Sequence, residues 1–147
     1  MASVASLRHA EPQDAPALSE LLGELGYPAA PEEIPARLGA LEEHWGAIAF
    51  VAETEGRVVG VITCHVFPAI HSTPPVAWLT ALVVSSAVRG RGIGRQLVAR
   101  VERWAAERGA AKISLTSGLH RKEAHKFYES IGYAHSGVRL TKTLTPL

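Results

Sequence analysis

This sequence of 147 residues has a single cysteine, no long apolar run and a net charge close to zero. The one cysteine, Cys64, excludes an internal disulfide framework, and its apolar neighbours favour an inert core residue over a reactive thiol. No apolar run reaches the roughly 18 residues of a membrane-spanning helix, and the N-terminal residues lack the pattern of a signal peptide. The net charge of +1 gives no support for nucleic acid or a membrane surface as a partner. We therefore expect a globular protein that stays in the cytoplasm.

The expected fold is a single α/β (α+β) domain spanning residues 1–147, because the length suits one core. Apolar spacing and turn residues predict the element order β-α-α-β-β-β-α-β-α-β-β, with Pro68–Pro75 interrupting the sheet. The expected strands are Ser6–Ala10, Ala47–Glu53, Arg57–Phe67, Val76–Val84, Lys112–Thr116, Tyr133–Ser136 and Val138–Leu144. The expected helices run from Glu11 to Gly26, Glu32 to Glu43, Gly92 to Gly109 and Lys122 to Ile131.

The most informative stretch is the glycine-rich segment 89–95, which lies between the strand 76–84 and the helix that follows. The start of a helix has unpaired backbone N–H groups and partial positive charge, so it attracts anions. Glycines let a ligand approach the backbone, and arginines add fixed positive charge. The spacing Gly-x-Gly-x-Gly fits neither the Walker pattern nor the dinucleotide fingerprint. We expect this segment to bind a phosphate-bearing ligand, the alternative being an arginine-rich surface turn.

Two motifs resemble the GCN5-related N-acetyltransferase (GNAT) superfamily. Arg89-Gly90-Arg91-Gly92-Ile93-Gly94 matches its acyl-CoA loop, Gln/Arg-x-x-Gly-x-Gly/Ala, and the segment from Ala124 to Tyr133 is similar to Ala-x-x-Phe/Leu-Tyr-x-x-x-Gly-Phe/Tyr. The resemblance runs from about Leu7 to Leu144. It implies a mixed, mostly antiparallel sheet of six to seven strands with a central, splayed parallel pair and about four helices, and acetyl-CoA as cosubstrate.

The resemblance also implies site residues. Strand residues 82–84 would bind the pantetheine arm like an added strand, with the N–H of Val83 pointing at the thioester oxygen. Tyr128 would give a proton to the departing thiolate, which a phenol can do at pH 7 because its pKa is near 10; the alternative is a packed aromatic residue. The implied acetyl-CoA contacts are Leu82, Val83, Val84, Arg89, Gly90, Arg91, Gly92, Ile93, Gly94, Arg95, Ala124, Phe127 and Tyr128.

The sequence departs from the family pattern at the general base. Many relatives carry a glutamate on the strand before the loop, whereas residues 78–81 here read Trp-Leu-Thr-Ala. Thr80 can orient a water molecule but cannot act as a base near neutral pH. The candidate bases are therefore His65, His71, His120 or bulk water through a relay, histidine being favoured by its near-neutral pKa.

The acceptor amine is open. Residues 120–128, 139–142 and 65–71 are similar to aminoalkylphosphonate N-acetyltransferases, and an anionic acceptor would suit Lys122 and Arg139. Aminoglycosides, polyamines and protein amines are the alternatives. Arg121 replaces an asparagine of many relatives and is a candidate contact to the acceptor or to a CoA phosphate. Tyr27 is either an acceptor-pocket residue or a buried staple, and Thr80 and His71 complete the candidate substrate contacts.

Three further hypotheses concern the class of protein. A sensor of this fold would bind acyl-CoA without catalysis, and a protein or peptide N-acetyltransferase would use the same chemistry on a larger acceptor. A small nucleic-acid-binding domain would use the basic residues of 89–108, which the near-zero net charge disfavours. A homodimer is a candidate assembly. The seven histidines are not spaced as metal ligands, so no metal is expected.

Overall fold

The computed structural model describes residues 4–146, so the ends of the expected domain, residues 1–3 and 147, lie outside the described residues. The chain divides into two compact units, one up to Leu115 and one from Thr116 onward. Each unit is described by itself.

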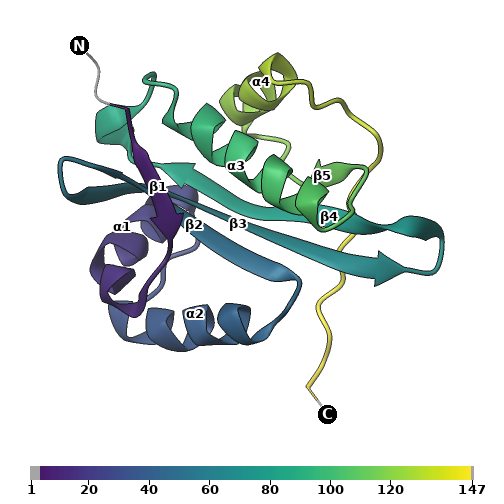
Figure 1. Cartoon of the computed structure of the whole chain (residues 1–147), viewed down its shortest axis with the longest axis horizontal. Helices are drawn as coiled ribbons and strands as arrows, with labels where there is room; N and C mark the ends of the chain where they lie inside the picture. Colours follow the sequence, from purple (N-terminus) through teal and green to yellow (C-terminus); the bar gives the residue numbers. More distant parts are fainter. Residues whose placement is uncertain (1–3, 147) are drawn as a thin grey trace. The chain divides into compact units, whose positions relative to one another are not determined.

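The first unit is a mixed five-stranded sheet flanked by helices (Figure 1). Its strand order is β1-β2-β3-β4-β5, with antiparallel neighbours except for the parallel pair β4–β5. This confirms the α+β class and the expected strand–loop–helix–strand unit. The elements are β1 (Ser6–His9), η1 (Pro12–Asp14), α1 (Ala15–Leu25), η2 (Pro31–Glu33), α2 (Ile34–Glu43), β2 (Ala47–Thr54), β3 (Arg57–Ala69), β4 (Ser72–Val84), η3 (Ser86–Val88), α3 (Ile93–Glu107) and β5 (Ile113–Leu115).

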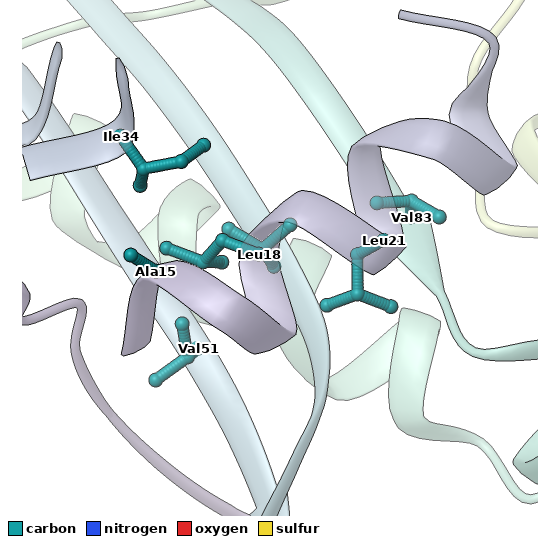
Figure 2. Packing of buried hydrophobic residues seen from close by; sticks show 7 residues of the cluster. Ala15, Leu18, Leu21, Ile34, Val51 and Val83 are labelled. Carbon is teal, nitrogen blue, oxygen red and sulfur yellow. The ribbon is translucent and has the colours of Figure 1, made fainter. Parts of the chain in front are cut away.

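One face of the sheet packs against α1 and α2. The apolar residues of α1 recur at helical spacing, so they share the side of the helix that meets the sheet. Val51, Val61 and Val83 lie opposite one another on three neighbouring strands and complete this core. Figure 2 shows the cluster, which consists of Ala15, Leu18, Leu21, Ile34, Val51, Val61 and Val83.

The other face carries α3. Because side chains alternate along a strand, Phe50 points to the face of β2 opposite to that of Val51. On that face the guanidinium of Arg100 from α3 lies 4.4 Å from the centroid of the Phe50 ring. The buried residues of α3 recur at helical spacing: Ile93, Leu97, Val98, Val101, Trp104 and Ala105. Cys64 is fully buried, and burial raises the pKa of its thiol to about 11, which supports the inert-core interpretation.

A buried ion pair ties β1 to the start of α1. Arg8 donates two hydrogen bonds to the carboxylate of Asp14, at 2.8 and 2.9 Å, and the backbone N–H of Glu11 donates a third, at 2.8 Å. Asp14 is 6% exposed. The Arg8 guanidinium and the Glu11 hydrogen bond hold the pKa of this carboxyl below its ordinary value against the opposing effect of burial.

The expected interruption at Pro68–Pro75 is wrong. β3 continues to Ala69 and β4 starts at Ser72, with only a register irregularity between Phe67 and Ala69. β5 pairs with β4 only at residues 77–79, so the prolines in the first part of β4 lie where that strand has an unpaired edge. On the other side, β3 has no residue paired with 73–75, so Pro74 and Pro75 remove no ladder hydrogen bond at either edge.

The second unit contains one helix, α4 (Lys122–Ser130), as expected. The two expected strands at 133–136 and 138–144 are absent, so the sheet has five strands and not six to seven. Alternating apolar residues predict a strand only if one face becomes buried. Here Val138, Leu140 and Leu144 are 90%, 93% and 81% exposed.

Candidate active site

The glycine-rich loop has the backbone conformation that its glycines permit. Gly90 and Gly92 have φ values of 83° and 80°, in the left-handed region, and α3 begins directly after Gly92. Nothing lies within 4 Å of a Cβ built on either residue, so conformation and not crowding accounts for glycine here. The first N–H groups of α3 therefore open onto an exposed loop, as an anion site requires.

The arginines of this loop are not equivalent. Arg89 donates from Nε to the carbonyl of Val84 at 3.2 Å, and its guanidinium lies 3.7 Å from Glu24. Glu24, on α1, also accepts from the backbone N–H of Ser86 at 3.0 Å. Arg89 and Glu24 thus fix the path of the loop. Arg91 and Arg95, the latter in the first turn of α3, are exposed, as Arg89 is. Sequence reasoning missed Glu24, which sits 62 positions from Ser86 and has no motif of its own.

The parallel strands part just before the loop. β4 pairs with β5 at Ala77, Trp78 and Leu79 only. Beyond Leu79, β4 has no described strand on that side through Val84, where Leu82 and Val83 were expected to bind pantetheine. The backbone along this edge is thus available for a ligand that adds like a strand.

A bulge marks the point of parting. Thr63 pairs with Ala81 and Cys64 with Leu79, which leaves Thr80 as the extra residue of β4. The hydroxyls of Thr63 and Thr80 are 2.6 Å apart and hydrogen-bonded, and Thr80 is exposed. The structure therefore gives Thr80 a polar partner at the end of the parallel pair.

In the second unit, Tyr128 lies on α4 with its ring against Phe127 and Tyr133, at centroid distances of 5.3 and 5.7 Å. Burial raises the pKa of the Tyr128 phenol above its ordinary value, against a smaller lowering effect of Arg121. The phenol is thus protonated at neutral pH and able to donate. Ala124 is half-buried on the same helix, and Arg121 is its N-cap residue.

Other polar candidates of the second unit hold its own loop together. His125 is hydrogen-bonded to the carbonyl of Gly118 at 2.9 Å, and Arg139 donates to the hydroxyl of Thr116 at 3.2 Å. His120 and Lys122 are exposed. Arg139 is therefore held near the start of this unit, consistent with a cation that has a fixed position.

The two candidate bases of the first unit, His65 and His71, lie at different positions along the β3–β4 hairpin. His71 is exposed at the tip, roughly 25 Å or more along β4 from Thr80 at about 3.3 Å per residue. His65 lies within β3, opposite Trp78. A direct part for His71 in proton transfer beside Thr80 is not supported by this position. Tyr27 is 66% exposed, so the buried-staple interpretation is wrong.

The described residues 4–146 contain no group of three or more His, Cys, Asp or Glu side chains arranged to hold a metal ion. Among the same residues, no helix has the length and apolar character needed to cross a membrane.

Residues 15–133 match the acetyltransferase (GNAT) family, a match that takes in residues of both units. This chain belongs to that family. It is 34% identical over 146 residues to the aminoalkylphosphonate N-acetyltransferase of Salmonella typhimurium, covering 96% of this chain and 92% of that protein. It is 28% identical over 137 residues to the aminoglycoside N(6')-acetyltransferase type 1 of Stenotrophomonas maltophilia, covering 90% and 88%.

Among solved structures, the aminoglycoside N-acetyltransferase AAC(6')-Iy in complex with CoA has a TM-score of 0.85 to this GNAT chain. The alignment covers 98% of this chain and 97% of that one at 17% identity, a likeness that shows the fold alone. The family match confirms the resemblance drawn from the two sequence motifs. The chain is therefore an acetyl-CoA-dependent N-acetyltransferase of the GNAT family.

Proposed function

We propose that this GNAT enzyme acts as one domain across residues 1–147 and transfers an acetyl group from acetyl-CoA to the primary amine of a small molecule. The amine attacks the thioester directly in a ternary complex. The observation that carries the proposal is the end of β4–β5 pairing after Leu79, on the strand that leads into a loop with two left-handed glycines and exposed arginines.

The chain's residues fit acetyl-CoA in two places. The phosphates would lie against the N–H groups at the start of α3 with Arg91 and Arg95, where a helix start and fixed cations favour negative charge. The pantetheine arm would pair with the unpaired β4 backbone at Leu82 to Val84. The side chain of Val83 is buried in the α1–α2 core, so its backbone is firmly placed for this role.

Acetyl transfer would need two groups described above, the backbone N–H of Val83 and the phenol of Tyr128. As the amine nitrogen bonds to the thioester carbon and the C–S bond breaks, negative charge develops first on the carbonyl oxygen and then on sulfur. The N–H of Val83 would stabilise the oxygen, and Tyr128 would give its proton to sulfur. The raised pKa of Tyr128 keeps that proton in place until the thiolate forms.

The acceptor is a small primary amine, with an aminoalkylphosphonate as the first candidate. The relative from Salmonella typhimurium bears that substrate in its name, and Arg121, Lys122 and Arg139 in the second unit suit an anionic group. An amine of an aminoglycoside is the second candidate, favoured by the name of the Stenotrophomonas relative.

The test is release of free thiol from acetyl-CoA with a panel of amines: 2-aminoethylphosphonate, kanamycin, spermidine and a short peptide. Tyr128→Phe removes the proton donor but keeps the ring, and we expect kcat to fall about 100-fold or more at pH 7. Turnover undiminished in Tyr128→Phe would contradict the assignment of the acid. Binding of acetyl-CoA without turnover on any amine would instead favour the non-catalytic sensor.

A further inference from the structure

The sheet face under α1 and α2 changes character along β3 and β4. Three rows of cross-strand neighbours can be followed on it, each about 7 Å from the next. The first row is apolar, with Val61 opposite Val83 in the core. The second row holds the hydroxyl pair of Thr63 and Thr80, and the third holds His65 opposite Trp78. The hydroxyl pair therefore stands midway between Val83 and His65.

His65 is a polar side chain that folding leaves without a partner. Its Nδ1 is buried and has no hydrogen bond in the described structure. The residue as a whole is half-buried, and Nδ1 is its buried, unpaired nitrogen whereas Nε2 is not buried, so the accessible side of the ring is the one that bears Nε2. An unpaired polar atom in the interior is costly, and such atoms in native proteins call for an explanation.

Within residues 4–146, His44 is the titratable group found against His65. The ring of His44, which follows α2, lies 6.0 Å away centroid to centroid, and its Nδ1 accepts the backbone N–H of Gly46 at 3.3 Å. The neighbours on the adjoining strands, Ala47 and Trp78, carry no charge. Burial, and then the neighbouring His44, lower the pKa of His65 below its ordinary value, so the ring is neutral at pH 7.

We propose that His65 is the proton-accepting residue of the reaction, reached from the acceptor amine through the Thr63–Thr80 hydroxyl pair and the water it orients. This inference rests on the proposed function, which places the thioester at Val83. An amine attacking there lies closer to the Thr63–Thr80 row than to His65. A water between two hydrogen bonds spans about 5.5–6 Å, most of the roughly 7 Å backbone spacing between the Thr63–Thr80 row and His65. Either hydroxyl of the pair can be the donor, as a relay requires.

The proton balance closes with groups of the chain. The acceptor arrives as an ammonium ion, and one of its protons passes through the relay to Nε2 of His65. The neutral amine then forms the C–N bond as the C–S bond breaks, and Tyr128 protonates the thiolate. As the amide forms, its nitrogen loses a second proton, which restores the phenol of Tyr128. His65 releases the first proton to solvent, which its lowered pKa favours. His65 thus supplies what a carboxylate on β4 would supply, and residues 76–84 contain none.

The experiment measures kcat against pH from 6 to 10 for the wild type, His65→Asn and His65→Gln, with the best amine of the panel at saturation. Asparagine and glutamine mimic the two ring nitrogens but cannot take a proton. We expect kcat to fall about 100-fold at pH 7 and the deficit to shrink steadily toward pH 10, because the amine then arrives deprotonated. Thr63→Val should show the same trend with a smaller deficit.

The matched control is His9→Asn, an exposed histidine on β1 in the same unit, which should leave the pH profile unchanged. A His65 deficit that is equal at all pH values, or no deficit, would overturn the relay while leaving the enzyme assignment intact. Loss of acetyl-CoA binding in His65→Asn would also overturn it, since that would indicate a structural role. Failure of the wild type on every amine would remove the proposed function and the relay together.

Discussion

The two units of the chain differ in how their apolar residues are used. In the first unit, helices and strands bury a continuous set of side chains on both faces of a sheet, and residues such as Leu18 and Ile62 are 3% and 0% exposed. In the second unit, α4 has no fully buried residue, and Val138 and Leu140 are almost fully exposed. The first unit thus contains the framework, and the second contains Tyr128, the proposed acid. A stable scaffold and a reactive group need not share one core.

Truncation of an apolar side chain should show the largest difference between the units. Leu18→Ala removes a buried side chain from the α1–α2 core and should lower the free energy of unfolding by about 2–5 kcal/mol. Leu140→Ala, its matched control in the second unit, should change it by less than about 0.5 kcal/mol because the side chain is 93% exposed. Denaturant unfolding measures both. Equal losses of unfolding free energy in the two variants would show that the side chain of Leu140 is buried in solution.

The Arg8–Asp14 pair should give the next largest effect. Asp14→Asn removes a buried, charge-assisted partner of Arg8 and should cost about 2 kcal/mol at pH 7. Folding lowers the pKa of Asp14, so its contribution to the free energy of unfolding is full above the unfolded pKa near 4. That contribution is lost progressively as the pH falls from there through the lower folded pKa.

Denaturant unfolding at pH 7 and at pH 3 checks this. The difference in unfolding free energy between wild type and Asp14→Asn should be smaller at pH 3 than at pH 7. A difference that is the same at both values would mean that the stabilisation does not depend on the charge of Asp14.

Sequence reasoning succeeded where local chemistry and burial agree. The positions of the loop at 89–94 and of the helix after it depend on neighbours in the chain, so glycine positions and helical spacing were sufficient to predict them. The same holds for α1, whose end at Gly26 has a φ of 99°.

It failed where the outcome depends on distant partners. The alternating apolar residues at 133–144 do not indicate whether another element will bury one face of them. The prolines at 68–75 predict a break in the sheet unless the unpaired edge of β4 is known. The contact of Glu24 with the loop and the neighbourhood of His44 and His65 are likewise set by tertiary structure.

Replacing one glycine of each unit with alanine should give the smallest effect on the free energy of unfolding. Gly92→Ala places a Cβ at a φ of 80° and should cost about 1–2 kcal/mol, because an L-residue is strained in that region. Gly137 in the second unit does not have a positive φ, and nothing lies within 4 Å of an added Cβ, so Gly137→Ala should be close to neutral. Thermal unfolding compares the two variants. Isothermal titration with acetyl-CoA should also show weaker binding for Gly92→Ala alone, since the strained loop presents the first N–H groups of α3. Normal affinity in a destabilised Gly92→Ala would separate the fold of the loop from the binding proposed for it.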